Sequence, residues 1–210
     1  MSSPPHYGSL QPASHLLPNQ SVHPGALRAQ RVVIDHALPL LIGCKRILDA
    51  PSRSGRLSIL LSKAGLSVTG VDKDERAVAT AREYASAATT FPAFQLGNIE
   101  NMSFADRHFD ATVCVQFYPS LADDLLRERV IAELCRVSNR YVLLSFLSPF
   151  SCAAMWRAAK WLAGRHNGLQ HSNSLRSLRT KLDQRGFRLI AAIPSSRFID
   201  GFCLGIFQRR

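Results

Sequence analysis

The sequence lacks any apolar run long enough to cross a bilayer, although hydrophobic residues make up 46% of its 210 residues. Residues 1–25 also lack the basic cluster followed by an apolar segment that marks a secretory signal. They are rich in Ser, Pro, His and Gln, so we expect a flexible N-terminal arm there. The remainder has a globular composition and a length that suits one domain, residues 26–210.

Cysteine pairs at the spacing of zinc ligands are also missing. The five cysteines are scattered, with neither a CxxC pair nor a histidine at zinc-ligand spacing, so we expect no metal site. Several of them fall in apolar segments, which is typical of buried free thiols. A reduced, cytoplasmic protein is the prediction. The cysteines are Cys44, Cys114, Cys135, Cys152 and Cys203.

Acidic residues are scarce in the last third of the chain. Residues 150–210 hold eleven Lys or Arg against Asp183 and Asp200, whereas residues 1–149 hold fifteen against thirteen acids. The last third therefore carries +9 of the net charge of +11. This excess predicts an anionic partner such as a polyanion, an anionic small molecule or an anionic membrane surface, and a solvated basic face explains it equally well. The sequence contains no strong nucleic-acid-binding motif and does not indicate an oligomeric state.

Apolar segments of strand length alternate with segments of helical periodicity, which predicts an α/β fold with a mostly parallel sheet. A helix is expected first, within residues 26–43. Strands follow at 46–50, 67–72, 93–98, 109–117 and 140–146, with helices at 56–64, 75–87 and 123–136 between them. An insertion-like helix at 151–165 and a helix at 174–185 come next. Strands at 187–193 and 202–208 end the chain and are expected to pair antiparallel at the sheet edge.

The loop after the first expected strand is poor in glycine. A dinucleotide-binding loop would carry GxGxxG, but "LDAPSRSGR" contains Gly55 alone, and the strand already ends in Asp49. A pyrophosphate would be repelled by that carboxylate. A cofactor with a cationic centre, an amino group and a ribose would suit it. In an open α/β sheet such a ligand binds at the carboxyl ends of the strands.

Five segments in order resemble class I S-adenosylmethionine-dependent methyltransferases (methyltransferase type 11/25-like domain). "ILDAPSRSGR" resembles the first motif in its variant form LDxPCGxGR, and "VTGVD" resembles the second, whose acid is Asp72 here. "GNIENMSFADRHFDATVCV", "LCRVSNRYVLLSF" and "LDQRGFRLIAA" are similar to later segments of the family. The resemblance implies a Rossmann-like, seven-stranded, mostly parallel sheet with helices on both faces and an antiparallel C-terminal strand. It also implies S-adenosyl-L-methionine as cofactor and a cofactor site made of Asp49, Ala50, Pro51, Arg53, Gly55, Asp72, Lys73, Asn98, Ile99 and Gln116.

Two departures from the family pattern affect this site. Asn98 replaces the usual acid at the adenine pocket, and its amide can still accept and donate hydrogen bonds. Ser52 and Arg53 replace residues for which the loop usually has Cys and Gly, and arginine resists both positive φ and a close approach of the ligand. Arg53 either turns outwards, to face the methionine carboxylate, or fills the pocket. We predict retained binding, with a degenerate glycine-rich loop.

Catalytic groups are not evident, because methyl transfer chiefly needs positioning and desolvation of the reactants. Tyr118 follows the fourth strand, and His166 and His171 lie in the insertion, so these three are weak candidates for an acid or base. Residues 149–172 are predicted to form a lid-like helical insertion. The prediction is therefore a methyltransferase that acts on a small-molecule acceptor. Within this prediction, an anionic or lipid-like acceptor is one option. The alternatives are a non-catalytic methyltransferase fold that serves as a binding or regulatory module, and an RNA methyltransferase.

Overall fold

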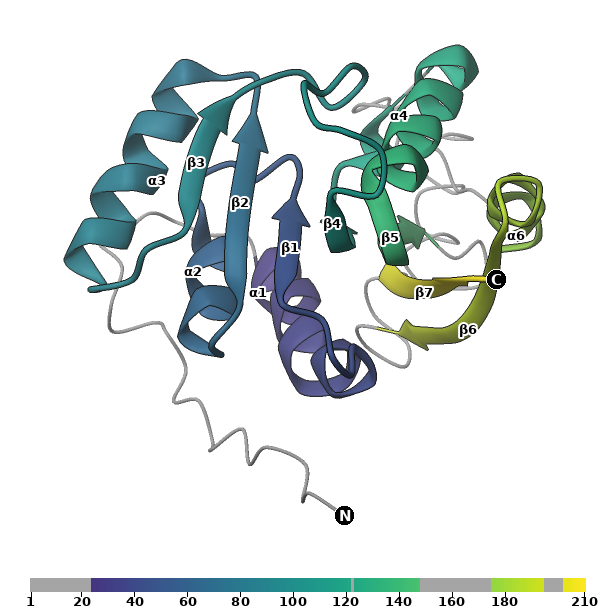
Figure 1. Cartoon of the computed structure of the whole chain (residues 1–210), viewed down its shortest axis with the longest axis horizontal. Helices are drawn as coiled ribbons and strands as arrows, with labels where there is room; N and C mark the ends of the chain where they lie inside the picture. The colour runs from purple at the N-terminus through teal and green to yellow at the C-terminus, as the bar shows by residue number, and fades with distance from the viewer. Residues whose placement is uncertain (1–23, 122, 148–174, 195–201) are drawn as a thin grey trace, which may run out of the picture.

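The computed structural model describes residues 24–121, 123–147, 175–194 and 202–210 (Figure 1). These residues form a seven-stranded sheet in the order β3-β2-β1-β4-β5-β7-β6. Strands β1 to β5 are parallel, and β7 is antiparallel to both β5 and β6. The predicted fold class is confirmed. The strands are β1 (Arg46–Asp49), β2 (Ser67–Asp72), β3 (Ala93–Leu96), β4 (Phe109–Cys114), β5 (Ser138–Leu147), β6 (Phe187–Pro194) and β7 (Phe202–Arg209).

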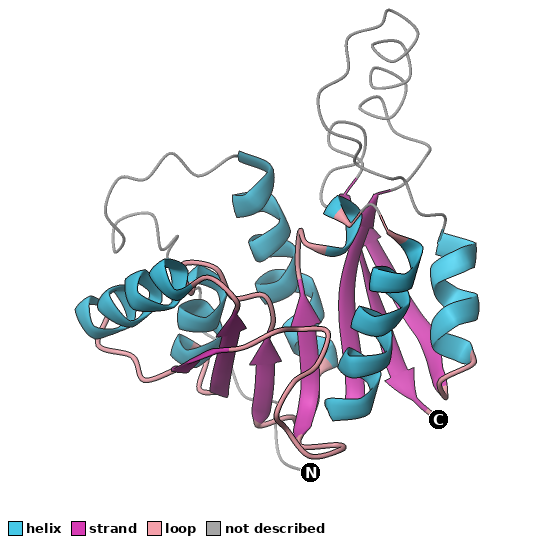
Figure 2. Cartoon of the chain, turned by 90° about the horizontal axis from the view of Figure 1, so that it is seen from above, coloured by secondary structure: helices cyan, strands magenta, loops and turns pink. Residues whose placement is uncertain are grey.

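Helices cover both faces of the sheet (Figure 2). Their apolar sides define two core clusters: α1 and α2 pack with one face of the central strands, and α4 and α6 pack with the other. Helix α3 contacts α2, β2 and β3. The helices are α1 (Pro24–Val32), α2 (Arg56–Lys63), α3 (Glu75–Ala87), α4 (Asp124–Val137) and α6 (Leu175–Asp183), with a 3-10 turn η4 (Tyr118–Ser120).

Strand β5 shows why the central strands are apolar on both faces. Its Leu143 packs with the α1 and α2 cluster, whereas its neighbours Val142 and Leu144 pack with the α4 and α6 cluster. All residues from Tyr141 to Leu147 are buried. A strand covered by helices on both sides cannot alternate apolar and polar residues, which explains the continuous apolar run in the sequence.

The N-terminal helix is interrupted, unlike the single helix that periodicity suggests. After α1 the backbone forms a π-helical turn, η2 (Val33–Ala37), and a 3-10 turn, η3 (Leu38–Leu40). Pro39 lies in that last turn, where it cannot donate a backbone hydrogen bond. The predicted arm at residues 1–25 and lid at 149–172 lie outside the described residues, apart from Pro24 and Gly25, which begin α1.

Candidate functional site at the carboxyl ends of the strands

The sheet reverses its strand order at β1. From β1 the chain moves outwards to β2 and β3, and it then returns to place β4 on the other side of β1. Ligands of open α/β sheets bind at such a switch point, outside the carboxyl ends of the strands. Asp49 ends β1 and Asp72 ends β2, so the two predicted carboxylates lie at this edge on neighbouring strands.

Asp49 is a buried carboxylate, 3% exposed. The Ser58 hydroxyl, near the start of α2, donates a hydrogen bond of 2.6 Å to its Oδ2. Burial raises the pKa of Asp49 to about 7, and the nearby charge of Asp72 adds to this shift, while the hydrogen bonds from Ser58 oppose it. A positive charge placed next to such a buried carboxyl group stabilises its ionised form.

Asp72 holds the loop that follows β1. Its Oδ2 accepts the backbone N–H of Arg53 at 2.7 Å, and its Oδ1 accepts that of Asp74 at 3.0 Å. The loop is further tied to β2 by a hydrogen bond of 2.8 Å from the Ser52 N–H to the Val71 carbonyl. Asp72 therefore shapes the loop as well as facing the site.

Arg53 adopts the left-handed conformation that a glycine would favour, with φ of 50°. It lies in a tight turn closed by the Gly55 N–H, which donates to the Ser52 carbonyl at 2.9 Å. A non-glycine residue pays about 1–2 kcal/mol for this conformation. The Arg53 side chain is exposed, so it turns outwards and does not fill the loop.

The packing around Gly55 explains why a glycine stands there, which the sequence alone did not indicate. It adopts φ of 72°, and a Cβ at this position would lie 2.6 Å from Phe94 Cζ and 2.8 Å from Ala81 Cβ. Phe94 of β3 also crosses over Gly70 of β2, where an added Cβ would lie 2.6 Å from its ring. The two glycines thus let one aromatic ring lie between the loop, α3 and the sheet.

The predicted adenine edge follows β3. The Gly97 N–H donates to the Asp72 carbonyl at 2.9 Å, and the exposed Asn98 accepts the Glu100 N–H on Oδ1 at 3.1 Å. The Ile99 side chain is buried in the core. Ile99 can therefore offer only its backbone to a ligand, and Lys73 projects into solvent beside Asp72.

Gln116 lies in the loop after β4 in a left-handed conformation, with φ of 59°. Its N–H donates a hydrogen bond of 2.6 Å to the hydroxyl of Ser145 on β5, which is buried. Backbone strain of this kind persists only where neighbouring contacts hold it, and it gathers at functional sites. Ser145 thus fixes the backbone direction at the carboxyl end of β4.

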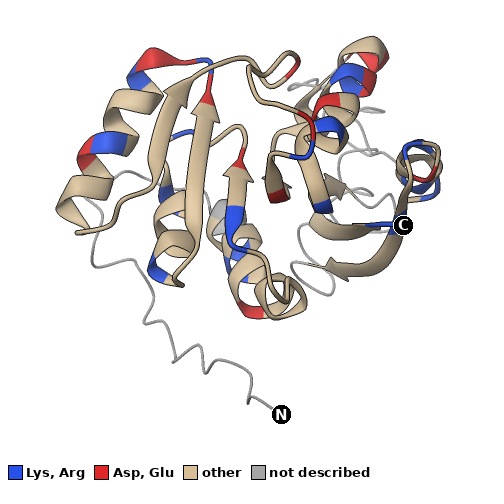
Figure 3. Ribbon diagram, in the orientation of Figure 1, with Lys and Arg blue, Asp and Glu red and all other residues tan. Residues whose placement is uncertain are grey.

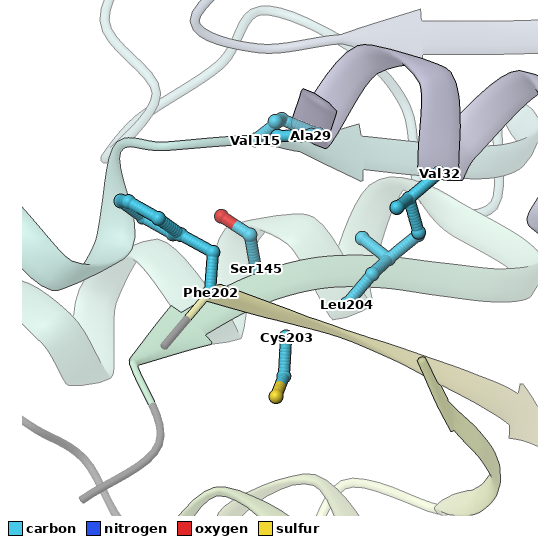
Figure 4. Close-up of a pocket in the computed structure, with 7 residues that line it drawn as sticks. All are labelled: Ala29, Val32, Val115, Ser145, Phe202, Cys203 and Leu204. Atoms are coloured by element: carbon cyan, nitrogen blue, oxygen red, sulfur yellow. The ribbon is translucent and has the colours of Figure 1, made fainter. Parts of the chain in front are cut away.

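A small apolar cleft, with a volume of about 10 Å³, lies next to Gln116, between α1 and the ends of β4, β5 and β7 (Figure 4). Phe202 and Leu204 of β7 lie on the same side of the sheet as Ser145, opposite Val115 and α1, while the Cys203 side chain points to the other face. The Ser145 hydroxyl is a polar group in an otherwise apolar wall. The residues that line the cleft are Ala29, Val32, Val115, Ser145, Phe202, Cys203 and Leu204.

The catalytic candidates receive no support from the described residues. Tyr118 lies in η4 and is 1% exposed, packed in the core cluster with α4, and burial raises the pKa of its phenol to about 12. A phenol buried in this way keeps its proton at neutral pH and does not reach the cleft. His166 and His171 lie outside the described residues.

Within the described ranges, no three His, Cys, Asp or Glu side chains come together in a way that could hold a metal ion. In the same part of the chain, no helix has both the length and the apolar character needed to cross a membrane.

Several residues of the site escaped sequence reasoning. Ser58 and Ser145 each place a hydroxyl beside a predicted site residue, and both stand alone among apolar neighbours in the segments "LSILL" and "VLLSF". A lone serine in a buried segment is a usable signal, because a buried hydroxyl needs a hydrogen-bond partner. Phe202 and α1 carried no such signal, since Phe202 reaches the site through the pairing of β7 with β5, and α1 through its packing on the central strands.

Comparison with known proteins agrees with this geometry. Residues 47–140 match the methyltransferase domain family. The magnesium protoporphyrin IX methyltransferase of Synechocystis PCC 6803 with bound S-adenosylhomocysteine (SAH) is 20% identical, covers 91% of this chain and 90% of its own, and has a TM-score of 0.74. A second structure of that enzyme holds S-adenosylmethionine and is 18% identical over 91% of this chain and 87% of its own, with a TM-score of 0.68.

An S-adenosylmethionine-dependent methyltransferase of Methanosarcina mazei is 22% identical, with 83% of this chain and 97% of that one covered and a TM-score of 0.71. No curated protein sequence matches the chain. The family match spans the strands and loops that carry Asp49, Asp72, Asn98 and Gln116, and the strand order extends the likeness to the rest of the described residues. The described residues therefore have the fold of the class I S-adenosylmethionine-dependent methyltransferases, and residues 47–140 match the methyltransferase domain family.

Proposed function

We propose that the protein methylates a small molecule, one apolar end of which contacts the small cleft between α1, β4, β5 and β7. The observation that supports this proposal is the position of the cleft, which opens beside Gln116 at the sheet edge that carries Asp49 and Asp72. Its wall is apolar except for the Ser145 hydroxyl, and its volume of about 10 Å³ admits only a small group at one end of the acceptor.

The residues at the switch point fit the cofactor. Burial raises the pKa of Asp49 to about 7, so the positive charge of the cofactor would stabilise its ionised form. The Ser52 hydroxyl is buried without a hydrogen-bond partner among the described residues, and the exposed Arg53 leaves the loop open. We assign Asp72 to the ribose hydroxyls, Asp49 to the cationic part and Arg53 to the methionine carboxylate. We assign Ala50, Pro51, Gly55 and Lys73 to the surrounding wall, and Asn98, Ile99 and Gln116 to the adenine side.

The bound cofactor supplies an activated methyl group, so the protein mainly orients the acceptor and excludes water. Gln116, held by Ser145, fixes the backbone at the border between the two binding regions. Phe202, Val115 and the α1 residues offer apolar surface to one end of the acceptor. No acid or base is assigned, in line with the burial of Tyr118.

Calorimetry with SAH tests the cofactor site and the alternative of a non-catalytic module. We expect the parent protein to bind SAH, and we expect Arg53→Gly to bind it equally or several-fold more weakly, because the outward arginine adds a contact to the carboxylate. A variant that gains binding that the parent lacks would instead favour the non-catalytic module. Lys63→Gln, which removes a positive charge at the far end of α2, is the control.

Phe202→Ala tests the acceptor cleft. In an assay of SAH formation over a panel of aromatic and aliphatic small molecules, we expect an acceptor that the parent methylates to show a KM raised about tenfold, because one aromatic wall is lost. The affinity for SAH should not change. Phe91→Ala is the matched control, since Phe91 is 93% exposed before β3. A KM unchanged by Phe202→Ala would contradict the assignment of the cleft.

The basic charge of the last third gives less support to an RNA acceptor. Among the described residues, Lys181 and Arg185 pair with Glu128, and Arg210 and Arg179 pair with Asp183. These four cations share two carboxylates, so the ion pairs engage part of the basic side chains within the fold. An anionic membrane surface and a cytoplasmic location stay predictions.

A further inference from the structure

A hollow of about 360 Å³ lies at the opposite end of the sheet from Asp49 and Asp72. It is lined by Arg107 before β4, Arg136 at the end of α4, Arg185 after α6 and Arg209 at the end of β7. Asp106 is the one acid among its lining residues. Figure 3 shows basic residues on α6 and at the end of β7, near the C-terminus. Four guanidinium groups in one hollow repel one another unless anionic groups offset their charge.

Two of these arginines are neutralised by neighbouring carboxylates. Arg136 donates to Glu133 at 2.8 Å and to Asp106 at 2.9 Å, and it also donates to two backbone carbonyls. Arg185 donates to Glu128 at 2.7 Å. The acids around the hollow are thus already engaged.

Arg209 is held by carbonyl groups, which orient its guanidinium without neutralising it. Its Nη2 donates to the carbonyls of Cys135 at 2.7 Å and Ser138 at 2.6 Å, and its Nε donates to that of Asn139 at 3.1 Å. No hydrogen bond within the described part of the chain engages its Nη1, and its guanidinium carbon lies 4.4 Å from the centre of the Phe187 ring. The group is therefore preorganised.

Arg107 brings a second positive charge close to Arg209. Its backbone N–H donates to the Arg136 carbonyl at 2.8 Å, which fixes this exposed loop residue at φ of 55°. Among the described residues neither Arg107 nor Arg209 forms an ion pair. Burial, followed by the charge of Arg107, holds the pKa of Arg209 below its ordinary value. Two guanidinium groups that repel one another are stabilised by an anion placed between them.

We propose that this hollow is a binding site for an anion of the phosphate class, held between Arg107 and Arg209. Guanidinium groups present forked donors that match phosphate oxygens. The hollow is concave and large enough for a phosphate with a small substituent, whereas the carboxylates of Asp106, Glu128 and Glu133 near its rim disfavour an extended polyanion. Two arginines of the basic C-terminal third, Arg185 and Arg209, would thus line an anion site that is separate from the cofactor site.

Thermal unfolding with inorganic phosphate tests the proposal, with chloride at equal ionic strength as reference. At a phosphate concentration ten times the Kd we expect Tm to rise by about 2–4 °C. Arg107→Gln should weaken phosphate binding at least tenfold, because the exposed Arg107 side chain supplies half of the charge. Arg107→Lys should recover part of it. The matched control is Arg31→Gln, which removes an exposed arginine from α1.

The proposal would be overturned by a parent protein whose Tm does not respond to phosphate beyond the chloride reference. An equal loss of affinity in Arg107→Gln and Arg31→Gln would contradict it as well. Binding of a single-stranded RNA with steep salt dependence, without binding of phosphate, would also overturn it and would favour an extended polyanion. SAH affinity, measured in the same variants, should stay at the parent value and serves as the check on folding.

Discussion

Replacing Asp49 with asparagine is expected to stabilise the cofactor-free protein at pH 8 by a few kcal/mol and to weaken cofactor binding severely. The reason is the buried carboxyl group, whose pKa is raised from 3.8 to about 7. A shift of about three units corresponds to roughly 4 kcal/mol between the two protonation states, which is the upper limit of the effect. Asparagine keeps the acceptor for Ser58 but carries no charge.

The sign of the pH dependence follows from proton binding in the two states. Between pH 3.8 and about 7, folded Asp49 keeps its proton while the unfolded chain has released it. The unfolding free energy contributed by this group therefore falls as pH rises through that window, and it is constant above it. Urea denaturation of parent and Asp49→Asn at pH 4.5, 6 and 8 measures the effect. We expect the difference between them to grow with pH.

Cofactor binding should show the opposite trend. A cationic ligand group beside Asp49 favours the ionised carboxyl, so binding below pH 7 releases a proton, and affinity should rise up to tenfold per pH unit until about pH 7. Calorimetry with S-adenosylmethionine in buffers of different ionisation enthalpy counts that proton. Asp49→Asn should bind at least tenfold more weakly and should not release it. An affinity independent of pH in the parent would show that Asp49 does not face the cationic group.

The sequence was sufficient to predict the elements whose patterns are local. Helix α3 has the predicted bounds, and β1, β2 and β4 begin where apolar runs and their flanking residues indicate. The cofactor edge followed from the same reasoning, because the carboxyl ends of parallel strands must share one edge. The aspartates after β1 and β2 were therefore predictable from their positions alone.

Other features depend on contacts between distant segments and left no local signal. Strand β7 inserts between β5 and β6 and pairs with β5 from Tyr141 to Leu147. That insertion creates both the apolar cleft at Phe202 and the hollow at Arg209. Likewise, Tyr118 follows a strand as a site residue would, but its ring packs into the core against α4.

Replacing Gly55 with alanine is expected to destabilise the protein by about 2–4 kcal/mol. Part of the cost, about 1 kcal/mol, comes from the positive φ of 72°. The remainder comes from overpacking, because the new Cβ would lie 2.6 Å from Phe94 Cζ and 2.8 Å from Ala81 Cβ. A buried ring has little room to move away from such a contact. Gly65→Ala is the matched control: φ is 87° there, but nothing lies within 4 Å of the added Cβ, so it should cost only the first part.

Urea denaturation of the two variants measures the difference, and Phe94→Leu combined with Gly55→Ala shows its cause. If the ring is responsible, the double variant should lose at least 1 kcal/mol less than the sum of the single changes. Equal costs for Gly55→Ala and Gly65→Ala would contradict the packing role. SAH affinity of folded Gly55→Ala then decides whether this glycine also serves the ligand. An unchanged affinity would leave Phe94 as the sole reason for a glycine in the loop, whereas a large loss would mean that the cofactor also approaches its backbone closely.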